Sequence, residues 1–261
     1  MEASLEQAFA SFAADPQADE LSALLLVNRL LAPALDLAQV RIGLQRLERA
    51  LPPAQPPWRF LREQGFQGNE SDYGSLDNSR LDRLLATRRG IPISLAVLLI
   101  HVARLAGHHA EGVNFPGHFL VRVDAHLIDP FHMLETTERA CLEGRAELVG
   151  QPGEALFQVA APAAMLIRML NNLKLAFAGS MAWHRALDVV DAQIILLPDE
   201  PGLRLERGDF WRRLGVVSAA RDSYQEASRL TQGAQDLRLQ EISKAVLARL
   251  RNLDGESDVV H

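Results

Sequence analysis

The feature that most constrains this chain is the unbroken apolar segment at residues 92–106. Pro92 suits the first turn of a helix, and Gly107 suits the position just beyond a helix end, so the segment is predicted to be helical. It is shorter than the roughly 20 apolar residues that a membrane-spanning helix needs. We therefore expect a buried helix at the centre of a globular core.

A β-hairpin is predicted directly after this helix. Residues 113–123 and 126–131 have strand character, and Asp124-Ala125 suits a two-residue turn. Side chains alternate between the faces of a strand, so this register places His118 and Asp129 on one face, diagonal to each other. A carboxylate there can fix the tautomer of an imidazole, as in a catalytic triad. The alternative is a half-buried structural histidine with a carboxylate partner.

Three segments, residues 78–99, 112–123 and 128–131, resemble bacterial proteins that join a transglutaminase-like domain to tetratricopeptide repeats. That group has been labelled as SirB-type regulators of invasion genes. The resemblance implies a papain-like core, in which a nucleophile-bearing helix packs on a small antiparallel sheet that presents a His and then an Asp. His118 and Asp129 take these two positions, and we expect His118 to point toward the N-terminus of the helix.

The nucleophile is where the chain departs from the superfamily pattern. Aligned without gaps, the pattern places Pro92 where the cysteine would stand. A shift of two residues offers Ser94, whose hydroxyl at a helix N-terminus could be activated by a nearby histidine. The ungapped register is better, which favours Ser94 as a first-turn residue bonded to the backbone. The only cysteine, Cys141, lies beyond the hairpin and is not expected to substitute.

Composition narrows the possible partners. A hydrophobic content of 48% with 23% charged residues is ordinary for a globular protein. The net charge of −6 gives no basic footprint, so no nucleic-acid partner is expected.

A single cysteine fits a reducing compartment. We expect a cytoplasmic protein without a membrane span, because no signal-peptide pattern and no long apolar run are present.

Metal or cofactor sites are not expected. His108 and His109 are adjacent, but no pair of histidines has a ligand spacing with a matching carboxylate. No glycine-rich loop precedes a helix with a suitable lysine. A metal-binding protein that uses His108, His109 and their neighbours is retained only as a third hypothesis.

The chain before this core is predicted to be helical, over residues 4–13, 20–34 and 36–51. The proline-rich residues 51–57 suit a rigid connector. The polar residues 65–78 are a predicted loop next to the candidate site. This loop could be a rim or lid, but a solvated connection is the preferred interpretation.

The chain after the core is also predicted to be helical, from about residue 162 to 251. Ala186 and Ala220 are 34 residues apart, as are Leu196 and Leu230, and 34 residues is the tetratricopeptide period. We interpret residues 165–251 as about one and a half to two degenerate repeats. A generic helical bundle is the alternative. Residues 147–152 could add a short strand.

The expected fold is α+β and mostly helical, with a papain-like transglutaminase core and small antiparallel sheet followed by tetratricopeptide-like helical repeats. The expected parts are an N-terminal helical segment (1–57), the core (58–160), the helical region (161–251) and a disordered tail (252–261). The favoured function is a non-catalytic, protein-binding or regulatory module whose C-terminal helices hold a protein partner. The alternatives are a hydrolase or acyltransferase that uses Ser94, His118 and Asp129, and the metal-binding protein.

Overall fold

A computed structural model describes residues 1–143, 145 and 152–253. The chain divides into two compact units, Pro16–Met169 and Met1–Asp15 with Leu170–His261. These boundaries differ from the expected ones, because the first helix groups with the C-terminal helices rather than with residues up to 57. The expected strand at 147–152 and the expected tail at 252–261 fall largely outside the described residues.

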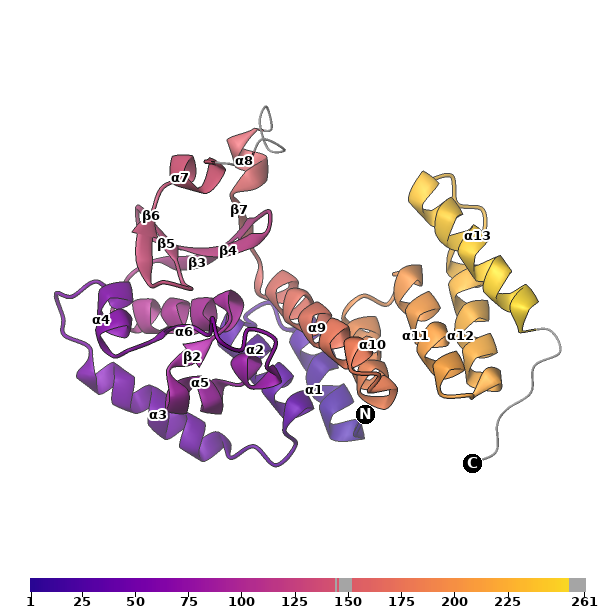
Figure 1. Cartoon of the computed structure of the whole chain (residues 1–261), viewed down its shortest axis with the longest axis horizontal. Helices are drawn as coiled ribbons and strands as arrows, with labels where there is room; N and C mark the ends of the chain where they lie inside the picture. The colour runs from indigo at the N-terminus through magenta and orange to yellow at the C-terminus, as the bar shows by residue number, and fades with distance from the viewer. Residues whose placement is uncertain (144, 146–151, 254–261) are drawn as a thin grey trace. The chain divides into compact units, whose positions relative to one another are not determined.

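The unit Pro16–Met169 combines helices with a small sheet, as expected for an α+β core (Figure 1). Its helices are α2 (Glu20–Leu31), α3 (Leu37–Ala50), α4 (Pro57–Glu63), the 3-10 helix η1 (Leu76–Ser79), α5 (Leu81–Thr87), α6 (Pro92–Leu105), α7 (Glu138–Leu142) and α8 (Gly153–Leu156), with α9 (Pro162–Gly179) beginning here. Its strands are β1 (Gln67–Gly68), β2 (Arg89–Gly90), β3 (Ala110–Phe115), β4 (His118–Val123), β5 (His126–Asp129), β6 (Leu134–Thr136) and β7 (Gln158–Ala160). Helix α2 stops at Leu31 rather than at residue 34, because Pro33 disfavours a helical conformation at Ala32.

Helix α6 is the predicted central helix, and it begins at Pro92 as expected. Nearly all its side chains from Ile93 to Ala103 are buried. Each fully buried Leu, Ile or Val side chain contributes about 1.5–3 kcal/mol through the hydrophobic effect. Arg104 near its end donates to the Glu20 carboxylate at 2.6 and 3.0 Å and to the Ala110 carbonyl oxygen at 2.8 Å. These bonds tie α6 to α2 and to β3.

The five-stranded sheet has the order β6-β5-β4-β3-β7 and is antiparallel throughout. The predicted hairpin is confirmed, because Val123 pairs with His126 across the turn at Asp124. Asp124 has a φ of 50°, a left-handed conformation that aspartate tolerates better than most residues. The register therefore places His118 and Asp129 on the same face of the sheet, as predicted.

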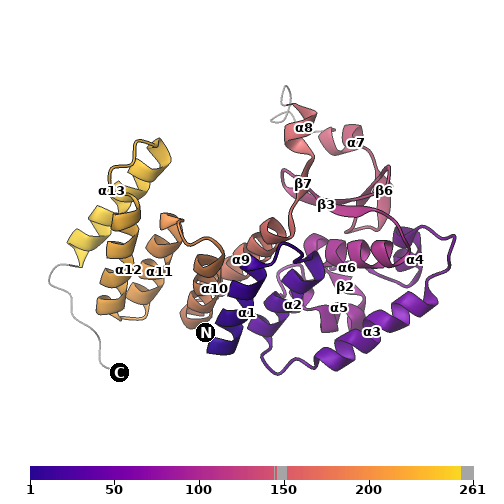
Figure 2. The ribbon, with the colours of Figure 1, turned by 180° about the vertical axis from the view of Figure 1, so that it is seen from behind.

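The two faces of this sheet are covered by different helices. Both views show α6 on one side and α7 and α8 on the other (Figures 1 and 2). The cluster on the α7 and α8 side consists of Val113, Phe115, Leu120, Leu127, Leu156 and Phe157, with Cys141 and Leu142 packed against it. Because side chains alternate, the face that carries Leu120 also carries His118. His118 is therefore on the side away from α6.

The unit formed by Met1–Asp15 and Leu170–His261 is helical in its described part. Its helices are α1 (Ala3–Ala14), the remainder of α9, α10 (Trp183–Leu196), α11 (Pro201–Arg213), α12 (Val217–Leu230) and α13 (Leu237–Asn252). Gln193 of α10 donates to Asn171 of α9 at 2.8 Å, and Trp183 of α10 stacks on Phe210 of α11. Helices α11, α12 and α13 follow one another as neighbours (Figure 2). Paired helices of this kind agree with the expected helical repeats.

Gly208 explains how closely α11 and α12 approach. A Cβ atom at this position would lie 2.3 Å from a ring carbon of Tyr224, which is fully buried. The Tyr224 hydroxyl donates to Asp209 at 2.7 Å, and Arg249 of α13 donates to the same carboxylate at 3.0 Å. The Asp209 carboxylate thus links α11, α12 and α13. Burial raises the pKa of Tyr224 above its usual range.

Candidate functional site

Ser94 is a buried helix-start residue in the structure. It lies in the first turn of α6 with no exposed surface. Its hydroxyl donates to the Asn78 carbonyl oxygen at 2.7 Å and also lies 3.0 Å from that of Ile91. The Ser94 hydroxyl oxygen in turn accepts a hydrogen bond from the Ile91 N–H at 3.2 Å. The hydroxyl is therefore engaged by the backbone, and Pro92, at the position of the superfamily's cysteine, has no nucleophilic group.

His118 opens β4 at the tip of the β3–β4 hairpin and is exposed. Its ring lies 6.3 Å from the ring of Phe115, its partner in the ladder. Phe115 belongs to the cluster under α7 and α8, so His118 does not point toward the N-terminus of α6 as expected. Arg168 of α9 donates to the His118 carbonyl oxygen at 3.2 Å and stacks over Phe119. Burial lowers the pKa of this arginine.

Asp129 is paired with a histidine, but with His132 rather than His118. The Nδ1 atom of His132 lies 2.6 Å from one carboxylate oxygen of Asp129, and the Phe131 N–H donates to the other at 2.8 Å. Such a carboxylate holds an imidazole in one orientation. No hydrogen bond joins any two of Ser94, His118 and Asp129, all three of which are described.

Cys141 lies in α7 and packs against the cluster that contains Phe115 and Leu127. Its sulfur is 3.8 Å from the Thr136 hydroxyl. Burial raises the pKa of the Cys141 thiol, which disfavours the reactive thiolate. The charge of the Asp129 carboxylate also raises this pKa.

Asn78 organises the loop that precedes α5. Its side-chain amide donates to the carbonyl oxygens of Asp72 at 2.6 Å and Tyr73 at 3.1 Å, and its side-chain oxygen accepts from Asn69 at 2.8 Å. Since the Asn78 carbonyl oxygen also accepts from Ser94, the loop is anchored to the start of α6. The loop therefore has a fixed internal structure rather than being a purely solvated connection.

This loop borders the Asp129–His132 pair. The Gly68 N–H donates to the Phe131 carbonyl oxygen at 2.6 Å, and a Cβ at Gly68 would lie 2.2 Å from the Phe131 ring. Tyr73, which is 57% exposed, has its ring 6.1 Å from that of Phe131. The sequence offered one signal for this arrangement, since His132 follows Asp129 by three residues across a tight turn. Tyr73 and Asn78 gave no signal.

Neither metal ligation nor a membrane span is supported by the described residues. No group of three or more His, Cys, Asp or Glu side chains gathers there in a way that could hold a metal ion. His108 instead contacts Asp124 at 2.7 Å, and Asp124 also accepts the His109 N–H at 3.0 Å. Within the same residues, no helix is both long enough and apolar enough to cross a membrane.

Residues 58–171, which hold the helix α6 and the five-stranded sheet, match the family model of the transglutaminase-like superfamily. Among individual proteins, the chain is similar to a UPF0162 protein of Xylella fastidiosa, with 37% identity over 176 residues, or 63% of each chain. A UPF0162 protein of Vibrio cholerae is 27% identical over 174 residues, or 64% of each chain. The chain therefore aligns with less than two thirds of the length of these relatives.

A eukaryotic protein is also similar to part of this chain. F-box only protein 21 of Homo sapiens is 30% identical over 169 residues, which is 58% of this chain and 26% of that protein. No solved structure gives a significant match. None of these names refers to tetratricopeptide repeats or to SirB-type proteins, so that part of the resemblance stays a prediction.

Proposed function

We propose that this chain is a non-catalytic transglutaminase-like protein, whose domain serves as a protein-interaction or regulatory module. The observation that carries the proposal is the state of Ser94, which lies two residues from the superfamily's nucleophile position. It is buried and bound to backbone oxygen atoms, while Pro92 occupies the ungapped position itself. A serine nucleophile needs a base within hydrogen-bonding reach and a free path to substrate.

The histidine geometry supports the same function. His118 and Leu120 lie on the sheet face that α7 and α8 cover. Ser94 belongs to α6, which covers the other face of the sheet. The Asp129–His132 pair resembles the base and orienting carboxylate of a triad, but no described serine, threonine or cysteine side chain forms a hydrogen bond with it. An exposed imidazole held in one orientation is equally suited to binding a polar group.

A protein partner is proposed for the C-terminal helices. Paired helices leave faces on which peptides or helices can dock. Leu175 of α9 is 71% exposed and Leu237 of α13 is 77% exposed. Exposed aliphatic side chains on such helices are candidate contacts. A single cysteine suits a reducing compartment, so we place this interaction in the cytoplasm.

Chemical probes test the absence of catalysis. We expect a fluorophosphonate and iodoacetamide to leave Ser94 and Cys141 unlabelled at catalytic rates in the full chain. Stoichiometric labelling of Ser94 that disappears in His118→Ala or Asp129→Asn would establish the hydrolase or acyltransferase instead. Labelling of Cys141 that disappears in His132→Ala would point to a different nucleophile and would equally overturn the proposal.

The partner assignment is tested with the full chain. Affinity purification with the wild type should recover a defined set of proteins, which Leu175→Glu together with Leu237→Glu should lose. Val159→Glu is the matched control, since Val159 is 56% exposed but lies in β7 of the other unit. If the double variant retains every partner, the C-terminal helices are not the docking element.

A further inference from the structure

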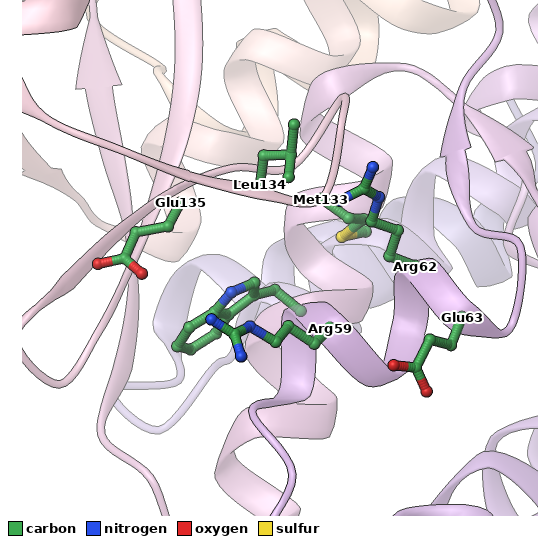
Figure 3. A pocket seen from close by; sticks show the side chains of 7 residues that line it. Arg59, Arg62, Glu63, Met133, Leu134 and Glu135 are labelled. Atoms are coloured by element: carbon green, nitrogen blue, oxygen red, sulfur yellow. The ribbon is translucent and has the colours of Figure 1, made fainter.

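A cleft between α4 and the beginning of β6 is not used by the function proposed above. It has a volume of about 610 Å³, which is within the usual range of ligand sites. Arg59, Arg62 and Trp58 line it from α4, and Met133, Leu134 and Glu135 line it from the opposite wall (Figure 3). Both walls belong to the unit Pro16–Met169.

The two arginines of the cleft lie beside two glutamates, so the cleft has no net formal charge, but the arginines are not paired with them. Arg59 and Arg62 are three residues apart, so they project from one side of α4, and both are exposed. Neither forms an ion pair with a carboxylate of the described residues. The two acidic side chains of the cleft already have partners, since Glu63 accepts from Gln55 and Glu135 contacts His126, each at 2.8 Å. The guanidinium groups are therefore available to an acidic ligand.

The opposite wall is an open sheet edge. Strand β6 is the last strand of the sheet and pairs only with β5. No backbone hydrogen bond from elsewhere in the described chain reaches Leu134, Glu135 or Thr136. The outward N–H and C=O groups of an edge strand can pair with an additional extended chain.

The cleft also offers apolar surface. Leu134 is 43% exposed, and it pairs with Asp129, so its side chain points to the sheet face away from α6. Trp58 contacts His126 on the opposite face, and both Trp58 and Met133 are buried. Met133 has a φ of 50°, an uncommon conformation for a residue other than glycine, and such residues concentrate at binding sites. Backbone donors and acceptors, apolar surface and two free cations thus meet in one place.

We propose that β6 and the Arg59/Arg62 pair form a docking site for an extended peptide segment that adds to the sheet edge. Alternate side chains of an added strand point to the same side. The arginines approach from the α4 side, and the exposed Leu134 side chain lies on the other face of the sheet edge. The peptide therefore carries an acidic residue directly next to an apolar one. This site is separate from Ser94 and His118 and does not depend on whether the domain is catalytic.

The test uses two blocked peptides of identical composition, acetyl-Thr-Asp-Leu-Thr-Thr-amide and acetyl-Thr-Asp-Thr-Leu-Thr-amide. Trp58 reports binding by fluorescence in the full chain carrying Trp183→Phe and Trp211→Phe. We expect the first peptide to bind about tenfold more tightly than the second, because only its Asp and Leu point to opposite faces. Equal affinities would overturn the proposal.

Charge is tested with a matched pair of variants. Arg59→Gln with Arg62→Gln should weaken binding of the first peptide about tenfold or more, since two charge-assisted hydrogen bonds are lost. Arg46→Gln with Arg49→Gln removes two exposed arginines at the same spacing on α3, away from the cleft, and should change the affinity less than about twofold. Similar losses in both pairs would show a general charge effect and contradict the proposal.

Two further measurements on the wild type keep the assignment falsifiable if a variant folds poorly. A version of the first peptide N-methylated on alternate residues should bind about tenfold more weakly if backbone pairing with β6 contributes. Succinate alone should bind far more weakly than the peptide. If succinate binds as tightly as the peptide, the cleft is a site for a small carboxylic acid, and the peptide assignment is wrong.

Discussion

The Ser94 hydroxyl donates to the backbone carbonyl oxygen of Asn78 at 2.7 Å, joining the start of α6 to a residue sixteen positions earlier in the chain. The same asparagine holds Asp72 and Tyr73 with its side chain. One serine therefore supports the whole loop beside the Asp129–His132 pair. This structural role explains a serine at the superfamily's helix start without assigning chemistry to it.

Ser94→Ala is expected to lower the free energy of unfolding by about 1–3 kcal/mol, because the buried Asn78 carbonyl oxygen and Ile91 N–H lose their partner. Urea denaturation measures this change. Ser22→Ala is the control, since Ser22 is exposed and only its backbone N–H is bonded, to Asp19. A Ser94→Ala protein as stable as the wild type would contradict the structural role.

Gly68→Ala is expected to displace Phe131, because the added Cβ would lie 2.2 Å from the ring. Overpacking of this kind costs about 1–3 kcal/mol and should separate Tyr73 from Phe131. Denaturation and the NMR shifts of the Phe131 ring measure both effects. Gly74→Ala, in the same loop and with no atom within 4 Å of its Cβ, should leave stability and shifts nearly unchanged.

Gly208→Ala is expected to force α11 and α12 apart. The new Cβ would lie 2.3 Å from the Tyr224 ring, whose hydroxyl is fixed by Asp209. We expect a loss of about 1–3 kcal/mol in the unfolding free energy, measured by thermal or chemical denaturation. Gly179→Ala at the end of α9 has no atom within 4 Å and serves as the control. Equal stability of the two variants would refute the close packing.

The hydrogen bonds of Asp124, at the β4–β5 turn, predict that the stability of the fold depends on pH. Hydrogen bonds from the His108 side chain and from the His109 N–H lower the pKa of the Asp124 carboxyl below its ordinary value of about 3.9. A carboxyl group whose pKa is lower in the folded than in the unfolded state stabilises the fold at pH values above its pKa in the unfolded chain. This contribution is lost as the pH falls through the folded pKa.

NMR titration of the Asp124 carboxyl carbon tests this expectation. Its apparent pKa should lie below about 3.9 in the wild type and rise toward that value in His108→Ala. His126→Ala removes a histidine that lies in the β4–β5 hairpin itself but contacts Glu135, and it should leave the Asp124 titration unchanged. An unaltered pKa in His108→Ala would show that the contact is unimportant in solution.

Local patterns predicted the elements that frame the site. The apolar segment bounded by Pro92 and Gly107 is α6, and the turn at Asp124 fixes the β4–β5 register. The alternation of strand side chains then follows, so the shared face of His118 and Asp129 was predictable. The partner of Asp129 was not, because two histidines lie within its reach and only packing selects His132.

What the sequence determined by itself is therefore the helix, the hairpin and its register, since propensity, periodicity and turn conformation depend on residues close together in the chain. Only the tertiary structure decided which sheet face α6 covers, that Ser94 is bound to Asn78, and that Arg59 and Leu134 line one cleft. These relationships join segments distant in the sequence. They result from the simultaneous packing of many side chains, which no local pattern records.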